Sequence, residues 1–252
     1  MVICHWGTIG VGVAIGIGVE MESDQPPPLR LSSSCYNRDI PAGNRLDGDA
    51  EQYVRHTAMM DTKPEITEES IAVLSAYGRI PISFEVRSVF DVQPLERGLA
   101  GIRLSEHPVA HPWVKDYDGL KGEGPTRWAG QWDLSHWGVI SAFGNTERIG
   151  GCVIAYDTPG VRKLQGRTDI AALWDIRVAP QHRRKGIGSL LVEAAAGWAK
   201  RHDCRLLKVE TQNVNVPACR FYAKHRFVLC AMNRHAYPEL PDEVELIWCR
   251  EL

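Results

Sequence analysis

The stretch LWDIRVAPQHRRKGIG, residues Leu173–Gly188, decides the fold of this chain. Its first part belongs to an apolar run, Ala171–Val178, that predicts a buried strand. A short turn containing Pro180 follows. A helix is predicted next, because apolar residues recur at helical spacing at Ile187, Leu190, Leu191, Ala194, Ala195 and Trp198. The sequence therefore predicts a strand, a glycine-containing turn and a helix in direct succession.

The turn between this strand and helix has the composition of an anion-binding site. The first N–H groups of a helix lack internal partners, and the helix dipole favours negative charge beside them. Gly186 and Gly188 have no Cβ and let an anion approach the backbone, while Arg183, Arg184 and Lys185 add positive charge. Neither Gly-x-x-x-x-Gly-Lys-Ser/Thr nor Gly-x-Gly-x-x-Gly is present, so these two nucleotide-binding motifs are excluded.

Length and composition limit the classes of protein to which the chain can belong. Of its 252 residues, 44% are hydrophobic and 24% are charged, which is typical of a soluble globular protein. The formal net charge of -2 gives no electrostatic reason to expect a nucleic-acid partner. The apolar run Gly7–Val19 is too short to span a bilayer, so no membrane partner is expected.

The cysteines and histidines predict neither disulfides nor a metal site. No Cys-x-x-Cys pair occurs, and none of the nine histidines has the spacing of metal ligands. The cysteines lie mostly in apolar runs, so we expect buried free thiols in a reducing compartment and a cytoplasmic location. The seven are Cys4, Cys35, Cys152, Cys204, Cys219, Cys230 and Cys249.

The chain is predicted to consist of an extension and one domain. Residues 22–61 are polar, contain Pro26–Pro28 and Ser32–Ser34, and show no periodicity. We therefore expect residues 1–63 to be an N-terminal extension that is largely disordered or non-native. The adjacent Met59 and Met60 are a candidate natural start. Residues 64–252 are expected to form the folded domain.

The domain is predicted to mix helices and strands. Helices are expected over residues 67–77, from residue 187 onward, and over 217–225 with Asn215 near the cap. Residues 95–130 are expected to be loop-rich. Strands are expected at Ile80–Val92, Trp137–Phe143, Ile149–Tyr156, Ala171–Val178, Arg205–Thr211, Phe227–Met232 and Val244–Trp248.

The order of these elements predicts an α+β fold. A helix separates Ala171–Val178 from Arg205–Thr211, so these two strands should lie parallel through a crossover connection. The strands that follow one another directly should pair antiparallel, and the turn Gly144–Asn145 is a hairpin signal between two of them. The expected sheet is therefore mixed, mostly antiparallel and flanked by helices.

Two motifs resemble those of a known superfamily. Arg183–Gly188, read as Arg-x-x-Gly-x-Gly behind a strand ending Asp-Ile-Arg-Val, resembles the acyl-CoA pyrophosphate loop of the GCN5-related N-acetyltransferases (GNAT). Asn215–Tyr222 resembles their Asn-x-x-Ala-x-x-x-Tyr segment. The resemblance covers roughly residues 66–252, and it implies a GNAT-type fold with a splayed parallel strand pair at the acyl-CoA site. Where Arg226 stands the family usually has glycine, so this helix end is expected to be distorted or destabilised.

The resemblance also implies a site for acetyl-CoA as co-substrate, without a metal. Backbone N–H groups from about Arg184 to Ser189 would hold the pyrophosphate, and an N–H near Val178 would stabilise the oxyanion. Tyr222 matches the family tyrosine that protonates the leaving thiolate, although a core aromatic is the alternative. The implied acetyl-CoA-binding residues are Ile176, Val178, Arg183, Arg184, Lys185, Gly186, Ile187, Gly188, Ser189, Asn215 and Tyr222.

Within the superfamily, three stretches are most similar to streptothricin acetyltransferases: Ile80–Val86, Trp113–Asp118 and Ala236–Trp248. They lie outside the acetyl-CoA motifs and therefore concern the acceptor. Streptothricin presents a β-lysine amine and is cationic, which suits a pocket of carboxylates and aromatic faces. The implied substrate-binding residues are Asp116, Tyr117, Asp118, Asp175, Tyr237 and Glu239.

The general base is less clearly marked by the sequence. An aliphatic amine has a pKa of about 10.4, so a base or a desolvating pocket must supply its neutral form. Glu210 ends the predicted parallel strand and is the first candidate for a catalytic base beside Tyr222. The alternatives are a water chain or one of the carboxylates of Asp116, Asp118, Asp133 and Asp175.

The resemblance implies an acetyl-CoA-dependent N-acetyltransferase for a small cationic amine, with streptothricin as the first candidate and antibiotic inactivation as the effect. A protein N-terminal or lysine acetyltransferase is an alternative in the same class. A non-catalytic acetyl-CoA sensor is an alternative from another class, and such a protein should lack the acid that Tyr222 would supply. Formation of a homodimer is left open by the sequence.

Overall fold

The structure is a computed structural model that describes residues 63–120 and 123–252. The predictions made for residues 1–62, including the natural start at Met59 or Met60, lie outside the described residues.

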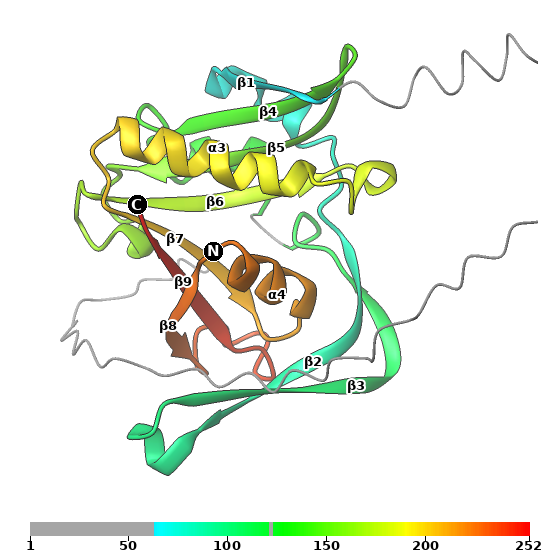
Figure 1. The fold of residues 1–252 in the computed structure, drawn as a ribbon, viewed down its shortest axis with the longest axis vertical. Helices are drawn as coiled ribbons and strands as arrows, with labels where there is room; N and C mark the ends of the chain where they lie inside the picture. The colour runs from blue at the N-terminus through cyan, green and yellow to red at the C-terminus, as the bar shows by residue number, and fades with distance from the viewer. Residues whose placement is uncertain (1–62, 121–122) are drawn as a thin grey trace, which may run out of the picture.

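A seven-stranded sheet forms the centre of the described chain (Figure 1). Its strands lie in the order β1-β4-β5-β6-β7-β9-β8. Strands β6 and β7 are parallel, and the other neighbouring strands are antiparallel. The strands are β1 (Glu65–Glu69), β4 (Gly138–Gly144), β5 (Glu147–Tyr156), β6 (Ile170–Val178), β7 (Leu206–Gln212), β8 (Val228–Asn233) and β9 (Glu245–Glu251). The α+β class and the mostly antiparallel sheet are confirmed.

Helices cover both faces of this sheet. Helix α3 (Ile187–Arg201) lies along β4, β5 and β6 on one face, as Figure 1 shows, and α4 (Val216–Lys224) follows β7 on that side. The short helix α2 (Leu74–Tyr77) and the 3-10 segment Pro125–Gly130 pack on the other face. Successive side chains of a strand point to opposite faces, and in β5 both sets are buried. Burial on two faces explains why these central strands read as continuous apolar runs.

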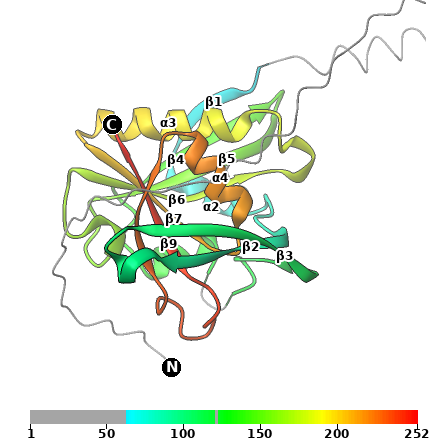
Figure 2. The ribbon, with the colours of Figure 1, turned by 60° about the horizontal axis from the view of Figure 1, so that its bottom comes forward.

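A separate two-stranded ribbon crosses one end of the sheet. It consists of β2 (Phe84–Pro94) and β3 (Ile102–Lys115), which pair antiparallel. Figure 2 shows the ribbon in front of the main sheet, beside α4 and β9. Asn213, which directly follows β7, holds the ribbon through two hydrogen bonds with the backbone of Phe90, at 2.9 and 3.0 Å. The ribbon thereby forms a wall beside the carboxyl end of β7.

The parallel strands β6 and β7 separate over half of their length. Pairing runs only from Ile170 and Leu206 to Leu173 and Val209. Directly beyond Leu173, Trp174 is an extra residue in the register with β5, which marks a bulge. Both strands continue past this point without pairing with each other, so the expected splay is confirmed.

Several local predictions are confirmed. The β4–β5 hairpin turns at Asn145 and Thr146, directly after Gly144, and Asn145 adopts a positive φ of 56°. Helix α3 begins at Ile187, and α4 begins after Asn215, whose side chain accepts a hydrogen bond from Ala218 N at 3.2 Å. These elements depend on residues close in sequence, which is why the local pattern identified them.

Two predicted elements were wrong. Residues 67–69 were expected to start a helix, but they belong to β1, which pairs with β4, and Ser70 caps the next helical turn. The hydroxyl of Ser70 accepts from Ala72 N at 3.2 Å. Residues 95–130 were expected to be loop-rich, but they contain the 14-residue strand β3. Most side chains of β3 are exposed, so the apolar alternation that would reveal a half-buried strand is weak.

The helix end at Arg226 is regular, contrary to the expected distortion. Arg226 takes the positive φ of 65° that glycine normally supplies. Its N–H donates to Ala223 O at 3.2 Å, and Phe227 N–H donates to Tyr222 O at 3.1 Å. This is the hydrogen-bond pattern of a Schellman motif. Arg226 therefore keeps the geometry of the helix end, although this positive φ is strained for a residue that has a Cβ.

The prediction of free thiols was wrong for one pair. Cys230 and Cys249 form a disulfide between the neighbouring strands β8 and β9. Cys152, Cys204 and Cys219 are buried free thiols, as expected. The prediction failed because pairing across adjacent antiparallel strands depends on register, which single-residue patterns do not supply.

Candidate functional site

A cavity of about 500 Å³ opens where β6 and β7 separate. We call it the splay cavity. The two strands supply its sides, α4 and the turn after β3 supply further walls, and the β8–β9 connection closes over it. Its lining includes Tyr117, Asp118, Trp174, Asp175, Ile176, Val178, Glu210, Gln212, Asn215, Tyr222 and Tyr237. Nine of these eleven were predicted as site residues from the sequence, all except Trp174 and Gln212.

The backbone of β6 presents polar groups at this cavity that the pairing of the sheet does not use, and of these the C=O of Val178 accepts from Arg183. Ala179 N donates to Ile149 O at 2.9 Å, so this residue pair is a hydrogen-bonded pair of the antiparallel β5–β6 ladder. Hydrogen-bonded and non-hydrogen-bonded pairs alternate, so Ile176 and Val178 direct their N–H and C=O groups away from β5. Strand β7 is no longer paired at these positions, and an N–H there can therefore bind a ligand oxygen.

Tyr222 reaches the cavity from the inner face of α4. The residue is only 4% exposed, and it packs edge-on against Phe221 and Phe227. Its hydroxyl makes no hydrogen bond within the described residues, where no fully buried side-chain oxygen or nitrogen lacks a partner. The hydroxyl must therefore open into the cavity. Burial raises the pKa of the phenol well above its ordinary value, so Tyr222 stays protonated at neutral pH.

The turn before α3 has the shape of an anion cradle. Gly186 is the N-cap with a φ of 84°, and Arg184 also has a positive φ, of 65°. The first intrahelical bond runs from Leu190 N to Gly186 O, which leaves the N–H groups of residues 187–189 without helical acceptors. A Cβ on Gly188 would lie 3.3 Å from the Phe221 ring, so α4 closes tightly over this turn. The residues thus fit a pyrophosphate held by backbone N–H groups.

The three cations of this turn differ in their surroundings. Arg184 and Lys185 are exposed at the surface. Arg183 was predicted to bind the pyrophosphate, but its guanidinium donates to three carbonyl oxygens, those of Val178, Ser83 and Pro81, at 3.0 to 3.1 Å. Arg183 therefore fastens the segment before β2 to the end of β6 instead of presenting its charge to a ligand.

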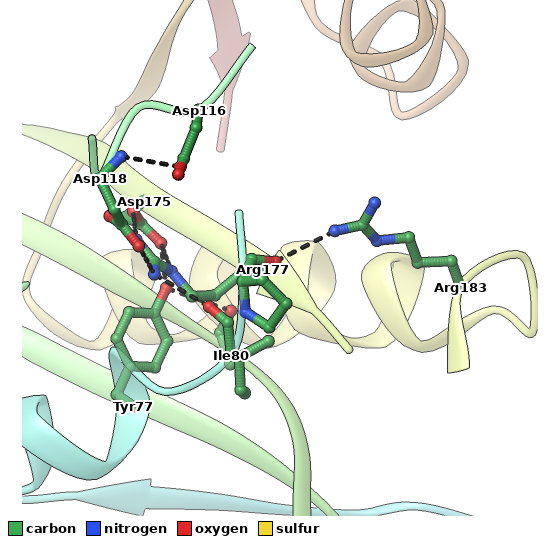
Figure 3. A network of polar contacts seen from close by, with 9 residues as sticks. Tyr77, Ile80, Asp116, Asp118, Asp175, Arg177 and Arg183 are labelled. Carbon is green, nitrogen blue, oxygen red and sulfur yellow. Dashed lines mark hydrogen bonds and ion pairs between the residues drawn. The ribbon is translucent and has the colours of Figure 1, made fainter. Parts of the chain in front are cut away.

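A buried ion network supports one side of the splay cavity (Figure 3). The Arg177 side chain is 1% exposed and bonds Asp175 at 2.6 and 2.9 Å and Asp118 at 2.7 and 3.1 Å. It also donates to Ile80 O at 3.0 Å, and Tyr77 donates to Asp175. Although burial opposes the charge of Arg177, these carboxylates raise its pKa above the ordinary value. The network fixes the turn that carries Tyr117 and Asp118 against β6.

On the opposite side, Glu210 meets a lysine from the loop before β6. Lys163 Nζ lies 2.8 Å from Glu210 Oε2 and 4.4 Å from the centre of the Trp174 ring. Tyr237 donates to Glu210 Oε1 at 2.6 Å. Burial opposes the charge of Glu210, but Lys163 and Tyr237 outweigh it, and the pKa of this carboxyl lies below its ordinary value. Glu210 is therefore an anion at neutral pH and a weak proton acceptor.

Two of the predicted substrate-binding residues lie outside the splay cavity. Asp116 shapes the turn after β3, because its carboxylate accepts from Asp118 N at 3.2 Å. Glu239 lines a second cavity described below. Asp175 does line the splay cavity, but Arg177 and Tyr77 occupy both of its oxygens. Asp133, an alternative base, caps its own loop by accepting from Ser135 N at 2.9 Å.

Sequence reasoning missed several side chains of the cavity wall, among them Arg177, Lys163 and Trp174. Arg177 could have been found, because it lies two residues after Asp175 and therefore on the same side of β6. Lys163 and Trp174 gave no local signal, since their contacts with the site join segments that are distant in sequence.

The described residues contain no group of three or more His, Cys, Asp or Glu side chains placed to hold a metal ion. None of the helices within that part of the chain has the length and apolar character needed to cross a bilayer.

Comparisons with known proteins identify a family and several relatives of this chain. Residues 103–227 match the acetyltransferase (GNAT) family. The chain is 40% identical over 93 residues to streptothricin acetyltransferase A of Bacillus subtilis (strain 168), a match that spans 33% of this chain and 53% of that relative. It is 29% identical over 168 residues to streptothricin acetyltransferase of Escherichia coli, which covers 66% of this chain and 83% of the relative.

A solved structure has the same fold. It is a Bacillus anthracis acetyltransferase in complex with acetyl coenzyme A, with a TM-score of 0.60 and 24% identity, and the match covers 75% of this chain and all of the other. The matched family region, residues 103–227, contains both the cradle before α3 and Tyr222. Residues 103–227 of this chain therefore form an acetyltransferase domain of the GNAT family.

Proposed function

We propose that this protein transfers the acetyl group of acetyl-CoA to an amine of a small polycationic antibiotic of the streptothricin class, and thereby inactivates it. The observation that carries the proposal is the splay cavity, which joins unpaired β6 backbone and the Tyr222 hydroxyl to a wall of carboxylates and aromatic rings. Relatives named for streptothricin acetylation support the choice of acceptor. A cytoplasmic location, where acetyl-CoA would be supplied, and a homodimer stay predictions.

In this proposal, the cradle before α3 holds the pyrophosphate and the end of β6 orients the acyl group. Acetyl-CoA supplies an activated thioester when it is bound. The N–H groups of residues 186–189 meet the pyrophosphate oxygens, and Arg184 and Lys185 add positive charge from the surface. The N–H of Val178 or Ile176 donates to the acyl oxygen, whose negative charge grows as the amine attacks. Asn215 contributes indirectly, because its side chain caps the helix that carries Tyr222.

Tyr222 is the proposed acid. Its hydroxyl opens into the cavity and carries its proton at neutral pH, so it can donate that proton to the departing thiolate. The carbon–sulfur bond breaks as the carbon–nitrogen bond forms, and the phenol proton passes to sulfur. The attacking neutral amine loses one proton to water, and the phenolate takes up one proton from water, so the reaction balances and Tyr222 is restored.

The walls of the cavity suit a cationic acceptor. Its charged lining residues include five carboxylates, Asp118, Asp175, Glu210, Glu243 and Glu123, against four bases, Lys115, Lys163, Arg177 and Arg183. The bases already contact carboxylates or carbonyl oxygens of the wall. The remaining negative charge attracts an ammonium group, and Tyr117, Trp174 and Tyr237 offer ring faces. Because the pKa of Glu210 is low, this carboxylate is a poor base. We therefore propose that Glu210 attracts the positively charged amine and that water removes the amine proton.

Steady-state kinetics test the proposal. Purified protein, acetyl-CoA and streptothricin should release free thiol, and mass spectrometry should detect a singly acetylated product. Rapid acetylation of peptides with a free N-terminus or lysine, without turnover of streptothricin, would favour a protein substrate. Binding of acetyl-CoA without turnover of any amine would favour a sensor. Either of the last two results would overturn the proposal.

A further inference from the structure

A second cavity of about 500 Å³ lies beneath the β2–β3 ribbon. Val89, Val109 and Trp113 of the ribbon form one side, and Glu239–Glu243 of the β8–β9 connection form the other. Asn213 and Val214, which follow β7, complete the lining. We call it the ribbon cavity.

The ribbon cavity adjoins the splay cavity. Leu240 and Glu243 line both spaces, so one molecule can extend from the first into the second along these two side chains. The Glu243 side chain is 11% exposed and pairs with Lys115 at 2.5 Å, which fixes the boundary between the cavities. The buried Lys115–Glu243 ion pair therefore holds this boundary in place.

The lining of the ribbon cavity fits a positively charged group. Its described lining residues include the carboxylates of Glu239, Asp242 and Glu243 but no lysine, arginine or histidine. Of the three, Glu243 is neutralised by Lys115, while Glu239 and Asp242 lie at the exposed rim. Trp113 is 41% exposed, a high value for such a large apolar side chain, and it stacks on no other ring within residues 63–120 and 123–252. Its indole can therefore offer a ring face to a cation. Val89 and Val109 provide contacts for a methylene chain.

We propose that the ribbon cavity binds a second cationic group of the acceptor while the first amine lies in the splay cavity. This inference rests on the proposed function and deepens it, because it limits the substrate class to amines with at least two positive charges joined by a flexible chain. The second group sets the affinity and the orientation of the acceptor. It does not take part in the transfer of the acetyl group.

Kinetics with streptothricin as the varied substrate test the role of this cavity. Glu239→Gln combined with Asp242→Asn should raise KM for streptothricin about five- to thirtyfold, and Trp113→Leu should raise it about threefold or more. Both variants should leave kcat and the affinity for acetyl-CoA unchanged, which also verifies that they fold. Glu147→Gln, which removes an exposed carboxylate from the β4–β5 hairpin, is the matched control and should leave KM unchanged. Unchanged KM in the double variant would overturn the inference.

A binding measurement separates this inference from the proposed function. Calorimetry with the wild-type protein should show tighter binding of spermidine than of butylamine by tenfold or more, and the double variant should reduce this preference to threefold or less. An equal preference in both proteins would overturn the ribbon cavity as a cation site. If streptothricin is not acetylated but the spermidine preference is present and is lost in the double variant, the proposed function alone fails.

Discussion

At the scale of single residues, Tyr222 is the side chain on which the proposed chemistry most depends. Tyr222→Phe keeps the ring that packs against Phe221 and Phe227 and removes only the hydroxyl. We expect kcat to fall roughly ten- to a thousandfold, because positioned acid catalysis contributes about 10²–10⁴-fold and water can partly replace it. The affinity for acetyl-CoA should change little, since the hydroxyl acts mainly in the transition state.

The measurement combines kcat, acetyl-CoA affinity by calorimetry and the melting temperature. Tyr156→Phe is a suitable control, because this tyrosine packs against Trp198 and does not line the splay cavity. Full activity of Tyr222→Phe with normal stability would make Tyr222 a core aromatic and leave the thiolate to water.

Arg226 allows a second test at this scale. Its φ of 65° is a conformation that costs a residue with a Cβ roughly 1–2 kcal/mol relative to glycine, part of which is offset by the greater freedom of glycine in the unfolded chain. Arg226→Gly should therefore raise the free energy of unfolding by about 0.5–1 kcal/mol. Thermal or urea unfolding measures the change.

The matched control is Arg226→Ala. It removes the same side chain, including the exposed 3.7 Å ion pair with Glu193, but keeps the Cβ at positive φ. Alanine should give no stabilisation. If alanine and glycine stabilise the protein equally, the effect comes from the lost side chain and the conformational argument is wrong.

At the scale of elements, the junction of β6, the glycine turn and α3 determines whether acetyl-CoA binds. Gly188→Asp should weaken binding of acetyl-CoA at least tenfold, because it places a carboxylate at the cradle proposed for the pyrophosphate. Gly188→Ala is the control for crowding, since its Cβ meets the Phe221 ring at 3.3 Å without adding charge. Calorimetry measures the affinity of both variants for acetyl-CoA. If the two affinities are equal, crowding and not charge explains the weaker binding.

Elements also show where sequence reasoning succeeds. Strands β5 and β6 are buried on both faces, and α3 buries one stripe, so their apolar patterns are strong and local. Strand β3 belongs to a ribbon whose residues are mostly exposed and contains Pro108 and Pro112, so it reads as loop. Strand β1 reads as a helix start because Thr67–Glu69 resembles a capped first turn, and only its pairing with β4 makes it a strand.

At the scale of the whole molecule, the two halves of the site differ in how far the sequence predicts them. The proposed acetyl-CoA half lies within one contiguous stretch, from β6 to α4, so a local pattern could suggest its residues, whereas the contacts of Arg183 with backbone carbonyl groups were not foreseen. The acceptor half depends on long-range pairs, such as Arg177 with Asp118 and Lys163 with Glu210. No spacing rule connects partners this far apart in the chain, so the sequence predicted the residue types but not their pairing.

The whole molecule also predicts what can be removed from it. The described strands of the sheet and the ribbon, and the described residues that line both cavities, come from the part of the chain that begins at Glu65. A shortened protein of residues 60–252 should therefore fold and acetylate at the wild-type rate. Circular dichroism and thiol-release kinetics check this. Insoluble protein or a lower kcat would show that the preceding residues contribute to the domain.

Because the ribbon is a sheet separate from the seven-stranded sheet, the acceptor specificity can change while the main sheet stays the same. The ribbon and the β8–β9 connection supply the walls nearest the proposed acceptor. Side-chain contacts join them to β6 and to the end of β7, namely those of Arg177 with Asp118, Asn213 with Phe90 and Val244, and Tyr237 with Glu210. Such an arrangement is modular. Exchange of residues 84–118 together with 234–243 between relatives should transplant acceptor preference as a unit, while the donor half stays intact.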